Sequence, residues 1–265
     1  ASVMATTPML IVRKPQTILQ AMQTVEYNAG LIIRAIFGAI NGIFVAPGPF
    51  SLFRKSVFEK LGGYRPAHNA EDMEITFRMQ KNFMKIVSSV DAYVETSTPP
   101  TLYKLYKQRL RWTQGFMQNS LDYKEMFLNP KYGNVALLAV PMGWFGIIMV
   151  IYTVISYLYY FLENATEWFR NYQAVGLDLS FRPLSEYLVI ISNQLYFSTN
   201  TLVLLSLPLI IISCAFIIVG HYMSRRESRR LRYILYFIFI WQFLVTLWFS
   251  VAVYNTIMSR KNSWR

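Results

Sequence analysis

The chain has 265 residues and a formal net charge of +12; 54% of its residues are hydrophobic and only 15% are charged. Soluble domains carry about 25% charged residues, so this composition argues against an ordinary soluble enzyme and against a disordered chain, and favours a membrane protein. The single cysteine, Cys214, leaves no basis for a disulfide framework or a cysteine-based metal site.

The first part of the chain mixes charged and apolar residues with Gly and Pro, as in a water-facing α/β or α+β unit. The apolar spacing of Gln16–Phe37 predicts an amphipathic helix that lies on the membrane or on the rest of the domain. Ile43–Val45 is expected to form a short strand, and Pro47-Gly48-Pro49 a turn. The next helix is predicted over Ser51–Leu61, with Ser51 as its N-cap and Gly62-Gly63 at its end.

A further helix is predicted from Ala70 to about Asn82, and it opens with Glu71-Asp72. Acids in a first turn suit the helix dipole, so one interpretation is capping by Asn69 or Asp72. The other is that a carboxylate takes a proton from an attacking hydroxyl. Spacing alone favours capping. Strand is then expected over residues 85–90 and 92–94, followed by a loop over 96–100.

The segment Thr101–Asn119 places chemically distinctive residues on one face of a predicted helix. Gln108, Arg111, Trp112 and Gly115 recur at helical spacing. A guanidinium suits a phosphate, an indole suits the face of a sugar or a base, and the glycine leaves a gap. Other basic residues surround the helix: Lys104, Lys107 and Arg109. They also fit a juxtamembrane helix whose basic side chains reach anionic headgroups, and both interpretations can hold on opposite faces.

Residues 134–265 have the pattern of membrane spans. Asn134–Leu162 is 29 residues without a charge, and about 20 apolar residues cross the hydrocarbon core. Tyr187–Met223 is also uncharged, but its 37 residues would measure about 55 Å as a helix, too long for one perpendicular span. The polar residues 198–201 are therefore expected to divide it into an interfacial segment and a span. Three spans are predicted, over about 135–162, 202–222 and 233–258.

Loop charges predict the orientation of these spans. The loop 221–232 is rich in arginine, whereas the loop 163–186 carries four acids and two arginines. The positive-inside rule places the first loop, and with it residues 1–133, in the cytoplasm. Three crossings would leave the basic C-terminal residues outside, against the rule. Either the last apolar run ends as a re-entrant or interfacial helix, or the rule fails there.

The order of the Gly48 turn, Glu71-Asp72 and Gln108-x-x-Arg111-Trp112, followed at once by apolar runs, resembles the membrane-embedded processive glycosyltransferases of family 2. These are the synthases of cellulose, chitin, hyaluronan and poly-N-acetylglucosamine. Gln-x-x-Arg-Trp is specific, and its spacing of about 36 residues from the acidic pair strengthens the match. Further similar positions are Gln23-x-x-Glu26-Tyr27, Phe53-Arg54 and Gly62-Gly63-Tyr64.

The resemblance covers essentially the whole chain and implies its architecture. Residues 1–100 would be the C-terminal half of an α/β, glycosyltransferase-A-like cytoplasmic domain. Residues 101–133 would be interfacial amphipathic helices, and residues 134–265 an α-helical transmembrane domain. The implied location is the plasma (inner) membrane.

The implied activity is inverting transfer of a sugar from a nucleotide-diphosphate sugar, such as a UDP-sugar, to the non-reducing end of a growing polysaccharide, coupled to its translocation. Asp72 matches the family's general base, and burial should raise its pKa. Glu71 matches the preceding acid, in a supporting role. Gln108, Arg111 and Trp112 match positions that bracket the nucleotide diphosphate and the acceptor sugar. The loop at the acceptor terminus is matched by four residues: Pro47, Gly48, Pro49 and Phe50.

One departure concerns the divalent metal, Mg²⁺ or Mn²⁺, that the resemblance implies. The family binds it with an Asp-x-Asp pair, and this sequence contains none. We therefore expect the metal ligands to lie outside this chain, this piece to be inactive alone, and the intact protein to carry about 150–200 residues ahead of Ala1. The expected partners are the nucleotide sugar, the polysaccharide and membrane lipid. Nucleic acid is not expected, because the basic residues adjoin the predicted spans.

Two alternatives remain open. The first is a non-processive family 2 transferase that adds one sugar to a lipid carrier, although such enzymes generally lack Gln-x-x-Arg-Trp. The second is a non-catalytic membrane scaffold or export subunit. Replacing Asp72 with Asn distinguishes an enzyme from a scaffold. A general base needs the carboxylate, whereas a scaffold should tolerate the neutral side chain.

Overall fold

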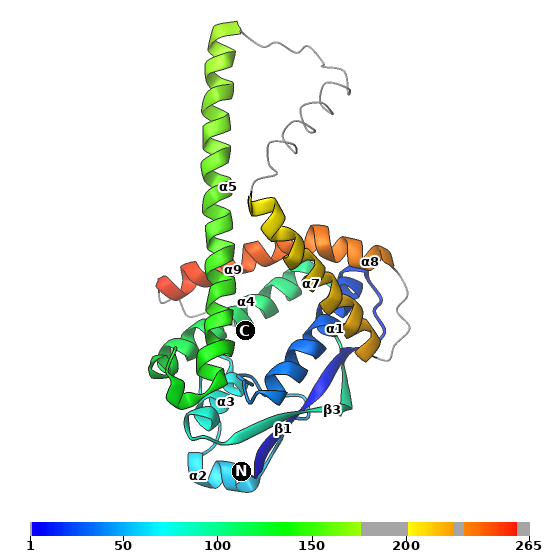
Figure 1. Ribbon diagram of the computed structural model, residues 1–265, viewed down its shortest axis with the longest axis vertical. Coiled ribbons are helices and arrows are strands. Elements are labelled where there is room, and N and C mark those ends of the chain that lie inside the picture. The colour runs from blue at the N-terminus through cyan, green and yellow to red at the C-terminus, as the bar shows by residue number, and fades with distance from the viewer. Residues whose placement is uncertain (1, 176–200, 225–230, 259–265) are drawn as a thin grey trace. The chain divides into compact units, whose positions relative to one another are not determined.

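The computed structural model describes residues 2–175, 201–224 and 231–258 (Figure 1). It divides into two units. One runs to Tyr152 and resumes at Val219, and the other comprises residues 153–218. All of the predicted site residues belong to the first unit.

A small mixed sheet forms the base of this unit, with strand order β2-β1-β3. The central strand β1 (Val3–Val12) pairs antiparallel with β2 (Leu52–Phe53) and parallel with β3 (Lys85–Thr96). A parallel pair needs a long crossover, which the intervening helices supply. The register slips where Pro8 pairs with Ser89 and the next residue pairs with Tyr93. This irregularity explains why the sequence predicts two strands where one continuous β3 exists.

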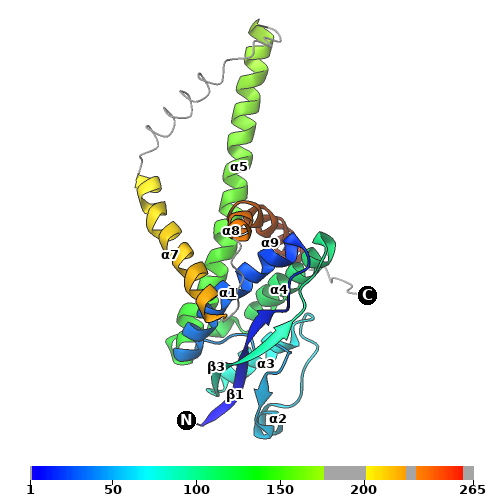
Figure 2. The same cartoon turned by 90° about the vertical axis from the view of Figure 1, so that its right-hand side faces the viewer.

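Helices cover the sheet and carry the site (Figures 1 and 2). The helix α1 (Ile18–Ala39) begins at an N-cap, Thr17, and contacts β1 and β3. The helix α3 (Glu71–Lys81) packs on α4 (Leu102–Asp122), which begins after the N-cap Thr101. These three helices confirm the predictions within a few residues, because each has a clear apolar period.

Two predictions for the segment between α1 and α3 are wrong. Residues 43–45 form no strand. Instead, Gln80 Nε2 donates to the Ile43 carbonyl (2.8 Å) and Thr76 Oγ1 accepts from the Ala46 N–H (2.9 Å). These α3 side chains replace the partners that a neighbouring strand would provide. The loop that leads to the Pro-Gly-Pro turn is thereby fixed to α3.

The helix α2 (Lys55–Leu61) starts four residues later than predicted. Its expected N-cap, Ser51, donates its hydroxyl to the Pro47 carbonyl at 2.6 Å, and Leu52–Phe53 pairs with β1. The end of the helix is as predicted, since Gly62 adopts φ +79°, which favours glycine.

Buried side chains form clusters on both sides of the sheet residues. One cluster joins the strands to α2 and α3: Ala5, Val57, Ile75, Met79 and Ile86. Another joins β1 to α1 through Met9, Ile11 and Leu31. A third joins α3 and α4 to later helices, with Phe77, Leu110, Phe116, Val135 and Ala252.

Among the residues described, one helix is long and apolar enough to cross a membrane, namely 135–173, and an 18-residue stretch of it has a mean hydropathy of 2.2. It comprises a π-helical turn, Val135–Ala139, and α5 (Val140–Val175). The predicted span 135–162 lies inside it. Glu163 and Glu167, which were expected to lie in the loop 163–186, instead continue the helix, and the rest of that loop after residue 175 lies outside the described residues.

The two later predicted spans are helical, but a three-span bundle is not confirmed. The helix α7 (Thr201–Met223) covers the predicted span 202–222. The third run comprises α8 (Leu231–Tyr236), a π-helical turn and α9 (Gln242–Ile257). It lies along α1 and α4, with Trp241 and Trp248 buried. The predicted interfacial segment 187–197 and most of the arginine-rich loop lie outside the described residues.

Candidate active site

A cavity of about 440 Å³ lies between the end of β1, α1, the loop after it, the N-terminus of α3, and α4. Eight of the nine predicted site residues line it: Pro47, Gly48, Pro49, Glu71, Asp72, Gln108, Arg111 and Trp112. Residues from three separate stretches of sequence therefore share one compartment. The ninth, Phe50, has a left-handed backbone (φ 55°) and a side chain that is 76% exposed, and it does not line the cavity.

The segment that presents Asp72 has an unusual backbone. His68 and Asn69 both adopt left-handed conformations (φ 53° and 60°), which are uncommon for residues other than glycine. Two side chains of α4 hold this segment. His68 Nε2 lies 2.8 Å from Asp122 Oδ2, and Arg111 donates to the Asn69 carbonyl at 3.1 Å. The acidic pair is thus attached to the helix that carries Arg111.

Neither predicted capping residue acts as the cap of α3. The N-cap residue is Ala70, which provides no side-chain cap. Asn69 precedes it and is engaged through its carbonyl, while Asp72 Oδ1 accepts from the adjacent Met73 N–H at 2.9 Å. The carboxylate therefore retains most of its acceptor capacity within the cavity.

Burial raises the pKa of Asp72, and the charge of Glu71 raises it further. The Met73 N–H bond and the charge of Arg111 act in the opposite direction. Desolvation of a carboxylate strengthens it as a base near neutral pH. The raised pKa expected from sequence is therefore present, with burial as its main cause.

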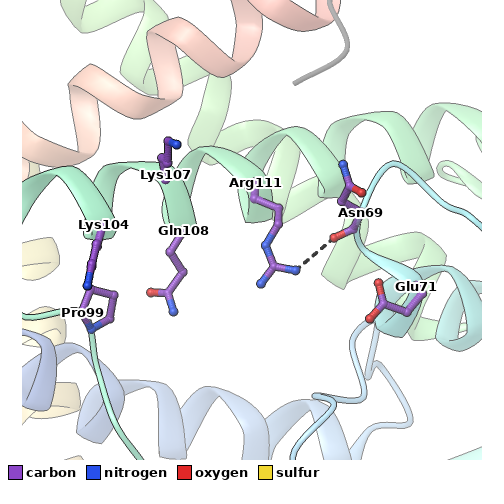
Figure 3. Close-up of a pocket in the computed structure, with 7 residues that line it drawn as sticks. All are labelled: Asn69, Glu71, Pro99, Lys104, Lys107, Gln108 and Arg111. Atoms are coloured by element: carbon purple, nitrogen blue, oxygen red, sulfur yellow. Dashed lines mark hydrogen bonds between the residues drawn. The ribbon is translucent and has the colours of Figure 1, made fainter. Parts of the chain in front are cut away.

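A second cavity, of about 530 Å³, adjoins the first (Figure 3). It shares Glu71, Gln108 and Arg111 with the first cavity and adds Lys104 and Lys107. Figure 3 shows Gln108 and Arg111 projecting from α4 into this space and Lys104 reaching toward Pro99. The result is a mainly basic compartment beside the one that contains Asp72. Such an arrangement suits a phosphate group.

Arg109 corrects the expectation that the basic residues of α4 spread over its surface. Its side chain is 8% exposed and pairs with Glu26 at 2.5 Å. Its guanidinium lies over the Trp112 ring at 4.5 Å from the centroid, with Tyr27 and Trp241 also within 6 Å. Burial raises the pKa of Glu26, while the charge and hydrogen bond of Arg109 lower it. Arg109 thus fixes one side of the indole that lines the cavity.

The contribution of α1 to the cavity was missed from sequence. Glu26, Gly30 and Arg34 recur every four residues, and all three line the cavity with Tyr27. That spacing places them on one helix face. Apart from the family match at Gln23-x-x-Glu26-Tyr27, the helix was interpreted only as amphipathic, although the isolated charges on its apolar background were the signal that could have identified this face.

The described residues do not form a site for a divalent cation. Nowhere in residues 2–175, 201–224 or 231–258 do three His, Cys, Asp or Glu side chains gather as metal ligands. Of the acids around the cavity, Glu26 is already paired with Arg109.

The carboxylate of Asp72 shares a cavity with the residues of the Gln-x-x-Arg-Trp helix, and a basic compartment lies beside it. This arrangement is that of a sugar-transferring class of enzyme. The family model for glycosyl transferase family group 2 matches residues 3–258, and the chain belongs to this family. The resemblance seen in the sequence is confirmed at this level, and the chain is glycosyltransferase sequence.

Sequence similarity to two named enzymes supports the same class of protein. The chain is 29% identical over 158 residues to a poly-beta-1,6-N-acetyl-D-glucosamine synthase of Staphylococcus epidermidis, covering 58% of this chain and 37% of that protein. It is 30% identical over 151 residues to the enzyme of the same name from Staphylococcus aureus strain COL, covering 56% and 35%. The chain thus spans little more than a third of the length of the curated relatives it matches.

Proposed function

We propose that this chain forms the acceptor-facing part of a polysaccharide synthase that transfers a sugar from a nucleotide-diphosphate sugar, such as a UDP-sugar, to the non-reducing end of a growing polymer. The observation that carries the proposal is that Asp72, Arg111 and Trp112 line one cavity. The names of the relatives support a polysaccharide product and an N-acetylglucosamine unit.

In this scheme Asp72 is the general base. Its free carboxylate oxygen takes the proton of an acceptor hydroxyl while the hydroxyl oxygen bonds to the anomeric carbon. The bond from that carbon to the diphosphate oxygen breaks, and its electron pair leaves with the nucleoside diphosphate. Attack opposite to the leaving group inverts the anomeric configuration. The half-buried position and raised pKa of Asp72 support this role.

Arg111 and the basic compartment are proposed to receive the diphosphate. Arg111 borders both cavities, so its guanidinium lies between the base and the departing charge. Lys104 and Gln108 offer further donors on the same side, whereas the Lys107 side chain points away from them (Figure 3). Preorganised donors aimed at a developing charge contribute most when they need no rearrangement. No step uses a metal ion, because the described residues offer it no ligand set.

Trp112 is proposed to be the platform for the terminal sugar of the acceptor. An indole presents a broad apolar face, and Arg109 stacks on this ring. Glu71 is proposed to support Asp72, since its charge keeps the proton affinity of its neighbour high. The loop from Pro47 to Pro49 then borders the acceptor.

We further propose an integral membrane location in the plasma (inner) membrane, with the site in the cytoplasm and the polymer passing outward. The apolar helix 135–173 supports it by length and composition, and it follows α4 closely in the chain. Membrane lipid would contact this helix. Processive addition would follow if the polymer stays bound between transfers.

The test is sugar incorporation by membranes that contain the full-length protein. Asp72→Asn should reduce polymer formation by about 10²–10⁴-fold, the usual contribution of a general base. Asp91→Asn is the matched control, because Asp91 is exposed on β3 and does not border either cavity. Wild-type polymer yield from Asp72→Asn would overturn the proposal. A product of one sugar on a lipid carrier would overturn the processive part.

A further inference from the structure

The guanidinium of Arg34 stands out among the arginines of the site because it makes no hydrogen bond or ion pair with any residue in the described part of the chain. Arg109 pairs with Glu26, and Arg111 donates to the Asn69 carbonyl. Arg34 is half-buried, and its surroundings include Asp72 and Tyr27 as electrostatic neighbours. Burial lowers the pKa of this guanidinium and the two neighbours raise it. The Arg34 guanidinium is therefore available to donate to a ligand that enters the cavity.

Arg34 also lies where two cavities meet. It lines the cavity of Asp72 and a smaller one of about 200 Å³. The two share Gly30, Arg34 and Val45 as their common wall. Beyond that wall, the smaller cavity is lined mainly by apolar side chains, among them Ile33 and Phe44. The site therefore offers hydrogen-bond donors directly beside a small apolar recess.

Gly30 keeps this recess open. A Cβ added there would have no heavy atom within 4 Å, so the absence of a side chain is not explained by helix packing. Glycine in the middle of a helix costs about 1 kcal/mol relative to alanine. A glycine that nothing in the packing requires, located at the wall of a ligand cavity, is consistent with space kept for a substrate.

We propose that Arg34, Gly30 and the apolar recess form a subsite for the acetamido group of the acceptor sugar. An arginine has donors only, so its partner must present an accepting oxygen, as an amide carbonyl does. The methyl carbon attached to that carbonyl then enters the apolar recess. A plain hydroxyl has no methyl group to fill the recess and accepts hydrogen bonds less strongly than an amide carbonyl. This subsite rests on the function proposed above and determines which sugar is accepted.

The experiment uses the full-length enzyme in membranes with two defined acceptors, an oligosaccharide of N-acetylglucosamine and its glucose counterpart. The wild type should prefer the acetylated acceptor. Arg34→Met and Gly30→Leu should each raise KM for it by roughly tenfold or more and leave KM for the glucose acceptor within about twofold. KM for the nucleotide sugar should not change, because the basic compartment is untouched.

Two controls match the substitutions in chemistry. Arg13→Met removes an exposed arginine that borders neither cavity. Gly146→Leu adds the same side chain to a helical glycine with open space around it. Both should retain wild-type acceptor preference. If a variant makes no product, saturation-transfer NMR on the purified enzyme decides, since contact with the acetyl methyl protons should be lost only in the site variants.

An unchanged acceptor preference, or an unchanged NMR contact, in both site variants would overturn the subsite. This outcome differs from failure of the proposed function. If the proposed function fails, Asp72→Asn leaves polymer synthesis intact, whatever acceptor preference the Arg34 variant shows.

Discussion

Gly115 permits a close approach between the two halves of the site. A Cβ placed on it would lie 2.5 Å from the Ala70 Cβ. Carbon atoms in contact are separated by about 3.5–4.0 Å. Gly115→Ala must therefore move α4 and the start of α3 apart by roughly 1 Å. The bond from Arg111 to the Asn69 carbonyl lies at this same junction and would lengthen.

The expected losses of catalysis and of stability are similar in free energy, because a hundredfold change in rate corresponds to about 2.7 kcal/mol. Overpacking costs about 1–3 kcal/mol, and replacing a helical glycine with alanine returns up to about 1 kcal/mol. The free energy of unfolding should thus fall by at most about 3 kcal/mol. A displacement of about 1 Å between reacting groups can reduce the rate by about a hundredfold. Polymer synthesis in membranes and thermal unfolding of the purified protein measure the two effects separately.

A compensating substitution tests the reasoning directly. Ala70→Gly removes the methyl group that Gly115→Ala would meet, and the next atoms, Ala70 Cα and the His68 carbonyl, lie at 3.9 Å. Glycine is accepted at an N-cap better than alanine. The double variant should therefore recover most of the activity. Gly146→Ala is the control, because its surroundings are open. Wild-type activity in Gly115→Ala, or no recovery in the double variant, would refute the argument.

Three further predictions concern buried polar groups. The pKa of Asp72 is higher in the folded than in the unfolded protein, so stability falls as pH rises from the unfolded pKa through the folded pKa. Asp72→Asn should therefore raise the melting temperature at neutral pH. An unchanged or lower melting temperature at pH 7 counts against this prediction. Tyr123→Phe removes the donor to Glu74 Oε1 (2.7 Å), and chemical denaturation should report a loss of about 1–3 kcal/mol; a loss below 0.5 kcal/mol would contradict this. Glu26→Ala leaves the Arg109 charge buried without its partner and should lower the free energy of unfolding by about 3 kcal/mol. The partial exposure of Glu26 reduces this loss somewhat. Full stability of the variant would show that the pair contributes nothing.

The central helices and their shared face were predictable because they depend on local periodicity. The spacing of Gln108, Arg111 and Trp112 fixes their common side of α4 once the helix forms, and Thr101 supplies its cap. The acidic pair was also placed at a helix start. Only Gly115 needed the structure for its explanation, since the residue it accommodates, Ala70, belongs to another helix.

The parts that sequence could not predict depend on contacts distant in the chain. The loop over residues 43–46 has the composition of a strand, but Thr76 and Gln80 bind its backbone from α3. Ser51 looks like a cap, and its hydroxyl instead closes the turn at Pro47. No local pattern contains this information. The strand predicted over 43–45 and the predicted start of α2 were wrong for this reason.

Charged residues on a helix pose the same difficulty for the site. An arginine that reaches lipid, one that pairs with a buried acid and one that awaits a ligand have the same spacing in a sequence. Arg109 proved to be paired, and Arg34 was not considered as a site residue. Burial and partners, which are tertiary properties, distinguish these cases.

The distribution of charge gives the two cavities different preferences. The cavity that contains Asp72 is bordered by three acids and three arginines, so its charges balance and it suits a neutral sugar. The neighbouring cavity sets a single acid, Glu71, against Lys104, Lys107 and Arg111. That excess of positive charge suits a diphosphate. Arg111 and Glu71 border both, so a donor bound in one cavity and an acceptor bound in the other would meet at the residue pair that joins them. A direction of reaction, from the basic compartment toward the carboxylate, is thus consistent with the arrangement of the charges alone.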